Sequence, residues 1–228
     1  MSEQEAVVKS IGIIGGTGKE GKGLAYRWLK AGFHVLIGSR QAEKARSAAA
    51  ELKVLLPECD VRGLTNEVVA EEADLVVITV PFSAHRPTLE GLRNALEGKI
   101  VMDVTVPLVP PKVTRVQMPP AGSATMEAQE ILGPNVQVVA AFQNISYEHL
   151  LHDEEVGCDV LVCGGNKAAR TTVLGLVGAA GLTGWDAGPV ENAVVVEGMT
   201  SVLIGINKQF GVQSAGIRIT GIPRGQNS

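Results

Sequence analysis

The sequence predicts an α/β protein with a doubly wound parallel sheet and a small helical extension at its C-terminal end. Two observations lead to this fold class. Short, continuously apolar runs alternate with segments of helical periodicity, and a glycine-rich turn separates the first apolar run from the first helix. Such alternation implies right-handed crossovers between parallel strands, and runs without polar alternation indicate strands that are buried on both faces.

The expected strands are the apolar runs of the chain. They occupy residues 11–14, 35–37, 75–80, 100–102, 136–140 and 160–163, and residues 183–189 follow as a last strand and turn. Their spacing leaves room for a helix of 10 to 15 residues in most of the intervals, as expected for a sheet that is covered on both faces.

The expected helices lie between these runs, and the first has apolar residues at the i, i+4 spacing of one helix face. The expected segments are a helix around Leu24 to Leu29, an Ala-rich helix at 42–56, one that starts at Ser123, one at 166–180 and a long one from about 190 to 210. In the long helix, Glu197 is the only charge between residues 193 and 207. This segment is therefore expected to be buried at a domain or subunit interface, or against its own subunit.

Composition argues against several functional classes. The 228 residues carry a net charge of −4 and only 4% are aromatic, so neither a basic field nor stacking platforms for nucleic acid are expected. The polar start of the chain and the lack of an apolar run of about 18 residues argue against a membrane span and favour a cytoplasmic location. Cys59, Cys158 and Cys163 are irregularly spaced, so neither a disulfide framework nor a metal site is expected.

A glycine motif at residues 16–21 predicts a Rossmann-type dinucleotide-binding fold. Gly16, Gly18 and Gly21 form the pattern G-x-G-x-x-G directly after an apolar run and before a helix. Glycine is needed there because backbone N–H groups must approach a pyrophosphate at the helix N-terminus, where a side chain would block the contact. The other cofactor-binding residues predicted in this turn are Thr17, Lys19 and Glu20.

The end of the second strand favours NADP(H) as the cofactor. An NAD-binding protein has an acidic residue there that accepts the ribose 2′-hydroxyl, whereas this chain has Ser39 and Arg40, and Lys44 follows one helical turn later. A guanidinium fork and an ammonium group suit a 2′-phosphate, so these three residues are predicted to bind it. The alternative is that the two basic side chains only face solvent at a helix end.

Residues 1–156 are expected to form the NADP-binding domain, and residues 157–228 a small C-terminal domain that borders the substrate cleft. A stiff loop at 105–122 carries five of the eleven prolines. Loops at the carboxyl ends of parallel strands border the ligand crevice, so this loop is predicted to form a wall of the site. Val80 and Pro81 are predicted to lie against the nicotinamide, the alternative being that Pro81 only ends its strand.

Three further polar residues stand near the predicted crevice. Asp103 and Thr105 follow a predicted strand and either contact substrate or cap the loop, and His85 lies just beyond Pro81, where it is a candidate to approach the cofactor. The sequence has no Ser-His-Asp arrangement, carboxylate pair or metal-ligand spacing that would indicate another chemistry.

Six short motifs occur along the chain in a specific order. They are Gly15-Gly16-Thr17-Gly18 with Gly21-Lys22-Gly23-Leu24-Ala25, Gly38-Ser39-Arg40, Thr79-Val80-Pro81, residues 159–164, Asp186-Ala187-Gly188-Pro189 and Ala215-Gly216-Ile217-Arg218-Ile219-Thr220-Gly221. Together they resemble the NADPH-dependent coenzyme F420 reductases over nearly the whole chain. The resemblance implies an NADP-dependent oxidoreductase that transfers a hydride between NADPH and the 5-deazaflavin coenzyme F420, in a small homodimer.

The resemblance also implies where the hydride acceptor lies. Gln143, Asn144 and Thr200 would be close to it, in a cleft bounded by the Pro-rich loop, residues 140–146 and the long C-terminal helix. Because a hydride moves directly between two stacked rings, the protein has to bind and orient them rather than supply a nucleophile.

Two positions differ from the family pattern. Gln143 stands where the family has a histidine, and Val194 stands where it has an arginine. The basic residues left to meet the anionic tail of the coenzyme are Lys208, Arg218 and Arg224. The differences leave two alternatives open, an NADPH-dependent reductase of another acceptor such as an imine, ketone or flavin, and a non-catalytic NADPH-sensing protein.

Overall fold

The structure is a computed structural model that describes residues 8–152 and 155–223, so the polar start of the chain and Arg224 lie outside the described residues. Its strands are β1 (Ser10–Ile14), β2 (His34–Ser39), β3 (Val61–Thr65), β4 (Leu75–Ile78), β5 (Ile100–Asp103), β6 (Gln137–Ala140), β7 (Asp159–Gly164) and β8 (Thr183–Asp186). Its helices are α1 (Lys19–Lys30), α2 (Ala42–Leu55), α3 (Asn66–Glu72), α4 (Phe82–Leu92), α5 (Ala124–Leu132), α6 (Lys167–Ala179) and α7 (Ala193–Phe210), with the 3-10 helices η1 (Tyr147–His149) and η2 (Val190–Asn192).

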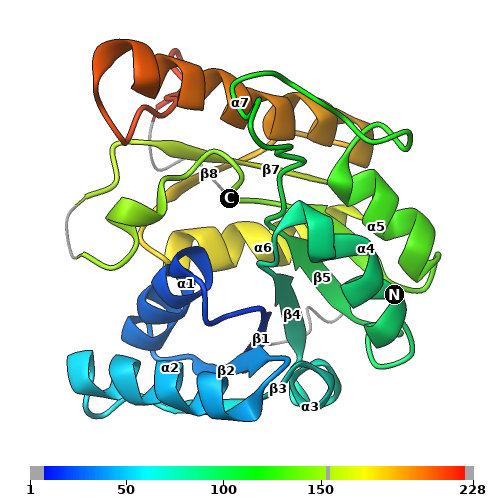
Figure 1. Ribbon diagram of the computed structural model, residues 1–228, viewed down its shortest axis with the longest axis vertical. Helices are drawn as coiled ribbons and strands as arrows, with labels where there is room; N and C mark the ends of the chain where they lie inside the picture. Colours follow the sequence, from blue (N-terminus) through cyan, green and yellow to red (C-terminus); the bar gives the residue numbers. More distant parts are fainter. Residues whose placement is uncertain (1–7, 153–154, 224–228) are drawn as a thin grey trace.

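The strands form one sheet in the order β3-β2-β1-β4-β5-β6-β7-β8 (Figure 1). All neighbours are parallel except β6 and β7. The order of the first six is that of a doubly wound dinucleotide-binding sheet, in which the strand order reverses between β1 and β4. The predicted fold class is therefore confirmed, and the ligand crevice is expected at the carboxyl ends of these two strands.

Apolar side chains fill the space on both faces of the sheet. On one face, α1, α2 and α6 enclose a core that includes the fully buried Trp28. On the other, α3, α4 and α5 enclose a second core around Leu89. The Trp28 indole donates to the Leu176 carbonyl of α6 at 2.9 Å. This contact joins residues on both sides of the domain boundary that the sequence predicts at residue 156. The division into two domains stays a prediction.

The antiparallel pairing of β6 with β7 corrects the expectation of an entirely parallel sheet. Val139 pairs with Gly164, and Ala140 pairs with Cys163. Parallel neighbours need a crossover connection, usually a helix, whereas η1 is the only helix described between these two strands. The chain therefore returns in the opposite direction along β6, and β7 and β8, which α6 connects, are parallel again.

Three elements were missed in the sequence, and one strand is shorter than expected. β3 contains Gly63, whose missing side chain lets α2 approach, since a Cβ there would lie 2.3 Å from the Ala45 carbonyl carbon. The strand therefore shows no continuous apolar run. The missed helices are α3, which is short, and α4, which contains Pro87. β4 ends at Ile78 rather than at residue 80, because Pro81 already caps the start of α4.

The long C-terminal helix is buried on one side only. It begins as η2 and becomes α7 at Ala193. Glu197 and Leu203 are buried, whereas Val195 and Val202 on the other side are 62% and 52% exposed. Figure 1 shows α7 at the outer edge of the molecule, beside the Pro-rich loop. Folding back onto its own chain therefore covers only part of this apolar helix.

Candidate dinucleotide and acceptor cleft

One continuous cleft of about 1400 Å³ lies at the carboxyl ends of the central strands. The turn after β1 and the start of α2 line it, and so do residues 142–147 and α7. The Pro-rich loop contributes Leu108, Pro110 and Val113 to its wall, as the sequence predicts. The volume exceeds the roughly 300 to 1000 Å³ of a pocket for one ligand, so the cleft has room for two.

The glycine turn between β1 and α1 is shaped by close backbone packing. The Gly16 N–H donates to the Gly38 carbonyl at 3.0 Å and so ties the turn to β2. A Cβ on Gly21 would lie 2.7 Å from the Gly16 Cα and 2.9 Å from the Thr79 Oγ1. Gly16 and Gly21 therefore allow α1 to pack against the sheet, and they do not themselves line the cleft.

Gly18 differs from these two glycines because its surroundings are open. It lines the cleft as the N-cap residue of α1, and the nearest atom to a Cβ placed on it would be 3.8 Å away. Within the described residues no side chain caps this end of α1. The N–H groups of the first turn are therefore left for a ligand, and a side chain at this position would occupy the space of an anion.

Thr17, Lys19 and Glu20 line the same part of the cleft. The Lys19 ammonium lies 4.7 Å from the ring centre of Tyr147 and 3.3 Å from its hydroxyl, a cation–π contact that links the turn to η1. Glu20 Oε1 is buried without a hydrogen-bond partner in the part of the chain that the structure describes. Burial raises the pKa of the Glu20 carboxyl to about 8, so this group is mostly protonated at neutral pH.

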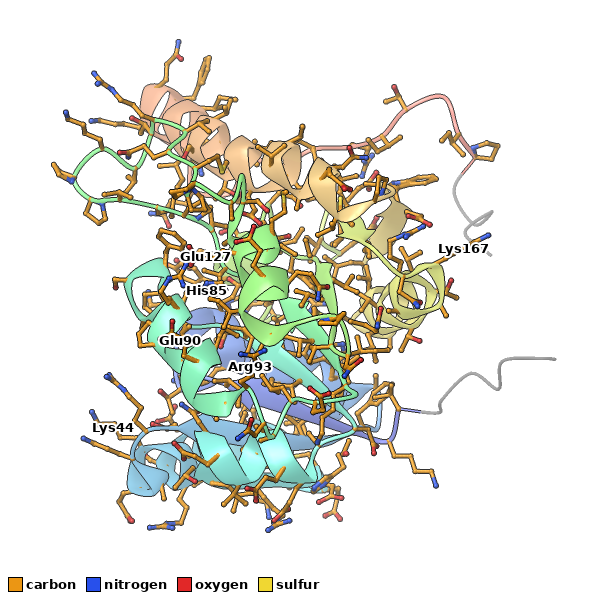
Figure 2. All side chains as sticks on the ribbon, turned by 90° about the vertical axis from the view of Figure 1, so that its right-hand side faces the viewer. Lys44, His85, Glu90, Arg93, Glu127 and Lys167 are labelled. Carbon is orange, nitrogen blue, oxygen red and sulfur yellow. The ribbon has the colours of Figure 1, made fainter. Side chains whose placement is uncertain are left out.

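Ser39, Arg40 and Lys44 are brought together at the end of β2 and the start of α2, and all three line the cleft. The Ser39 hydroxyl accepts the Gln41 N–H at 3.2 Å. Arg40 and Lys44 are exposed and form no ion pair with the residues the structure describes. Figure 2 shows Lys44 extending outward from α2. Two uncompensated cations thus stand where the sequence predicts a phosphate.

Val80 and Pro81 line the cleft next to the glycine turn. A Cβ on Gly15 would lie 2.7 Å from the Val80 Cγ1, so this side chain packs directly on the turn. Pro81 is the N-cap residue of α4. Pro81 therefore redirects the chain and also borders the cleft, and its contact with the nicotinamide stays a prediction.

Gln143 and Asn144 follow β6 and line the cleft together with Thr200 of α7. The Gln143 Nε2 donates to the Asp103 carbonyl at 2.7 Å, and the Thr200 hydroxyl donates to the Gln143 carbonyl at 2.7 Å. The Asn144 Nδ2 donates to the Asp159 carbonyl at 2.8 Å. Contacts to β5, β7 and α7 thus bring the three predicted acceptor-side residues together.

The sequence makes His85 a candidate to approach the cofactor, but this residue does not line the cleft. Its imidazole is fully buried, with Nε2 2.8 Å from the Asp103 Oδ2. Burial by itself would lower the pKa of His85, but the carboxylates of Asp103 and Glu127 raise it on balance. Figure 2 shows His85 and Glu127 close together, and their nearest nitrogen and oxygen atoms are 3.7 Å apart. Asp103 also accepts the Thr105 N–H at 3.0 Å, so it caps the loop, while Thr105 lines the cleft.

Basic side chains are unevenly distributed along the cleft. Among the described residues, those that line it are Lys19, Arg40 and Lys44. Val194 lies on the exposed side of α7 and does not line the cleft, and neither do Lys208 and Arg218. The position at which this chain lacks the family's arginine therefore lies outside its own cleft.

Asn66 and Thr79 also line the cleft, although neither is among the site residues predicted from the sequence. The Asn66 Oδ1 accepts the Gly15 N–H at 3.3 Å, and the Thr79 hydroxyl donates to the Ile14 carbonyl at 2.9 Å. Each follows the carboxyl end of a strand. Asn66 directly follows Thr65, the last residue of β3. Its position at the carboxyl end of a strand could be inferred from the sequence only if β3 were recognised as a strand.

Residues 8–152 and 155–223 contain no group of three or more His, Cys, Asp or Glu side chains placed to hold a metal ion. Over the same residues, no helix has the length and apolar character that crossing a membrane requires.

A doubly wound sheet whose glycine turn opens into a cleft at the switch point defines a Rossmann-type dinucleotide-binding protein. Comparison with known proteins is more specific. Residues 10–107 match the family described as NADP oxidoreductase coenzyme F420-dependent. The F420-dependent NADP reductase of Methanocaldococcus jannaschii is 38% identical over 221 residues, which cover 93% of this chain and 98% of the relative. The chain therefore belongs to the F420-dependent NADP reductase family.

A second relative agrees with this assignment, and a solved structure shares the fold. The F420-dependent NADP reductase of Methanothermobacter thermautotrophicus is 37% identical over 227 residues, covering 96% of this chain and 98% of the relative. A crystal structure from Arthrobacter sp. FB24, provisionally assigned as an F420-dependent NADP reductase, is 23% identical and superposes with a TM-score of 0.76 over 94% of this chain and 100% of the other. At that identity the second comparison supports the fold alone.

Proposed function

We propose that this protein transfers a hydride between NADPH and the 5-deazaflavin coenzyme F420. The observation that carries the proposal is the continuity of the cleft, which joins a part bearing free cations to a part whose polar side chains are uncharged. Two ligands in one cleft can bring their rings together, as direct hydride transfer requires. The family relationship supplies the acceptor, since the relatives that match over nearly their whole length are named F420-dependent NADP reductases.

NADPH suits the glycine turn and the end of β2. The uncapped N-terminus of α1 and the open surroundings of Gly18 favour a pyrophosphate there. Ser39, Arg40 and Lys44 would hold the 2′-phosphate, because a guanidinium fork and an ammonium group suit its charge and its several acceptor oxygens. The sequence has no carboxylate at the end of β2 that would repel this group.

The two coenzymes supply the chemistry, in which the nicotinamide and the deazaflavin exchange a hydride directly. The chain binds them, orients them and excludes water. We expect Val80 and Pro81 to lie against the nicotinamide, and Gln143, Asn144 and Thr200 to orient the polar edge of the deazaflavin. Each of these five residues lines the cleft.

The proposal is tested by following the absorbance of oxidised coenzyme F420 in its deazaflavin band during incubation with the purified protein and NADPH. Rapid loss of absorbance with NADPH, and much slower loss with NADH, is expected. No loss despite tight NADPH binding would reject F420 as the acceptor. A screen of imines, ketones and flavins would then separate a reductase of another acceptor from a sensor that binds NADPH without turnover.

We also propose that the protein is a homodimer formed through α7. Seven of the eleven large apolar side chains that the described residues expose lie on α7 or on the Pro-rich loop. On α7, Val195, Val202, Ile206 and Phe210 follow one another at intervals of seven, four and four residues, which places them on one side of the helix. A second copy offers the same uncharged stripe, as a two-fold interface requires.

Two other expectations remain proposals. Residues 157–228 would form a unit that borders the cleft, and α7 supports this because Thr200, Leu203 and Asn207 line it. A cytoplasmic location rests on the sequence alone.

A further inference from the structure

Two amide side chains that line the cleft carry buried oxygen atoms without a hydrogen-bond partner among the described residues. Gln143 and Asn144 are 4% and 3% exposed, and both line it. Gln143 Oε1 and Asn144 Oδ1 have no hydrogen-bond partner among the described residues. Buried amide oxygens nearly always find a donor in a folded protein. These two atoms therefore indicate a ligand that supplies hydrogen-bond donors.

Hydrogen bonds to the backbone determine which atom of each amide is left free. The Gln143 Nε2 lies 2.7 Å from the Asp103 carbonyl oxygen, and the Asn144 Nδ2 lies 2.8 Å from the Asp159 carbonyl oxygen. A carbonyl can only accept, so each amide must turn its NH2 group toward the protein. Rotating either amide by half a turn would place two oxygens against each other. Each side chain therefore offers a ligand an acceptor and not a donor.

The backbone that carries these amides is held in an uncommon conformation. Phe142, directly before Gln143, has a φ of 71°, in the left-handed region that bulky residues rarely adopt. Its buried ring packs edge to face against Trp28, with ring centres 6.0 Å apart, and the Thr200 hydroxyl holds the Gln143 carbonyl. Such conformations cluster at ligand sites, which supports a binding role for the two amides that follow.

We propose that Gln143 and Asn144 form a pair of fixed acceptors for N–H groups of the deazaflavin ring, and that they bind the reduced ring more tightly than the oxidised ring. This inference rests on the proposed function. Reduction adds a hydride to carbon 5 and a proton to nitrogen 1 of the ring. The pyrimidinedione of the reduced ring therefore has two N–H groups, at nitrogens 1 and 3, where that of the oxidised ring has one. Both amide oxygens are paired only in the reduced complex.

The size of the preference follows from one additional hydrogen bond, which corresponds to about fivefold to tenfold in affinity. A tenfold preference for the reduced ring raises the two-electron potential of the bound coenzyme by about 30 mV. Bound coenzyme F420 is thereby easier to reduce than free coenzyme, so the equilibrium between the bound forms shifts toward the reduced deazaflavin, whereas the overall equilibrium is unchanged.

The test measures binding rather than turnover. Dissociation constants of oxidised and reduced coenzyme F420 are determined by calorimetry without oxygen and without dinucleotide. The reduced form is expected to bind about fivefold to tenfold more tightly. Equal affinity, or tighter binding of the oxidised form, would overturn the inference and leave the proposed function standing. Binding of neither form would reject the proposed acceptor and the inference with it.

The variant Gln143→Met tests whether Gln143 causes the tighter binding of the reduced coenzyme. Gln143→Met keeps the length of the side chain but removes its amide, so the two forms of the coenzyme are expected to bind almost equally. Gln137→Met is the control, because Gln137 is the first residue of β6 and does not line the cleft. This variant should keep the wild-type ratio of the two dissociation constants. Equal weakening of both forms by Gln143→Met would assign its oxygen to the N–H group at nitrogen 3, and the same result for Asn144→Leu as well would overturn the inference. If the variant does not fold, the wild-type ratio decides.

The carboxamide of the nicotinamide is the other source of an N–H donor. An analogue of NADPH with an acetyl group in place of the carboxamide lacks this donor. The wild-type protein and Gln143→Met are expected to discriminate against the analogue equally. Discrimination by the wild type alone would show that Gln143 pairs with the nicotinamide, and would overturn the inference.

Discussion

Single side chains at the end of β2 are proposed to decide which dinucleotide the cleft favours. Arg40 is exposed, lines the cleft and has no ion-pair partner among the described residues. Its guanidinium gains a charged partner only when a ligand brings one. A 2′-phosphate is such a partner, and an unmodified ribose is not.

Arg40→Ala is therefore expected to raise the KM for NADPH by about tenfold to hundredfold, because a hydrogen bond to a charged group contributes about 1.5 to 3 kcal/mol. The KM for NADH should hardly change, and steady-state kinetics with each cofactor measures both. Arg46→Ala is the control, since Arg46 lies on α2 shortly after Arg40, pairs with Glu43 and does not line the cleft. Equal losses for NADPH and NADH would remove Arg40 from the 2′-phosphate site.

Glu20 is expected to lower the stability of the fold as the pH rises. Burial raises the pKa of its carboxyl from 4.5 to about 8. Between these values the folded state binds more protons than the unfolded state, so the free energy of unfolding falls with rising pH and the loss is complete above the folded pKa. Glu20→Gln cannot ionise and should exceed the wild type by on the order of 4 to 5 kcal/mol near pH 9, with little difference near pH 4.

Urea unfolding at the two pH values measures this difference. Glu67→Gln is a matched control, because Glu67 lines the same cleft but is exposed. A stability gain for Glu20→Gln that is the same at both pH values would show that ionisation of Glu20 is not its cause.

At the scale of elements, one buried carboxylate joins α7 to α5. Glu197 accepts the Ala124 N–H at 2.7 Å, the Thr125 N–H at 3.0 Å and the Thr125 hydroxyl at 2.7 Å. Burial raises the pKa of Glu197 to about 7, and the donors of Thr125 oppose this effect. Glu197, the only charge between residues 193 and 207, thus accepts N–H groups at the N-terminus of α5, where the Ser123 side chain provides a further cap.

Glu197→Ala is expected to lower the free energy of unfolding by about 2 to 4 kcal/mol, because it leaves buried donors without an acceptor. Glu197→Gln keeps one acceptor oxygen and should lose less. Denaturant unfolding measures both, with Glu191→Ala as the control on the exposed η2. A loss below about 0.5 kcal/mol, the range of ordinary surface substitutions, would show that the contact to α5 does not hold α7.

The sequence predicts those elements whose signal is local. β1 is a continuous apolar run, α2 and α6 are uninterrupted helical segments, and the observed bounds of all three lie within two residues of the expected ones. β3 and α4 carry conflicting signals in Gly63 and Pro87, which packing against neighbouring elements overrides. The direction of β7 could not be predicted, because it depends on how the long connection after β6 folds and not on the strand's own residues.

The same distinction applies to the candidate site, where residues placed by local geometry are predictable and residues placed by distant contacts are not. The glycine turn and Arg40 were predictable because their spacing from β1 and β2 is set by local geometry. The orientation of Gln143 was not, because it depends on the Asp103 carbonyl, 40 residues earlier in the chain. The burial of His85 likewise results from Asp103 and from Glu127 on another helix.

At the scale of the whole molecule, the described chain leaves one apolar side of α7 uncovered while the adjoining side lines the cleft. Leu203 and Asn207 line the cleft, and Val202 and Ile206, one position away from each, are exposed. A surface of this kind marks an interaction site. A second copy on α7 would therefore support the cleft wall from behind.

Val202→Glu is expected to convert a dimer into a monomer, because it would place charges in the centre of an uncharged two-fold interface. Sedimentation velocity measures the change, and Val54→Glu, at a residue of α2 that is 81% exposed, should leave the dimer intact. A wild-type protein that sediments as a monomer at micromolar concentration would reject the dimer. If the partner steadies α7, the monomeric variant should lose more affinity for coenzyme F420 than for NADPH, because α7 lines the cleft through Thr200 beside Gln143, away from the glycine turn.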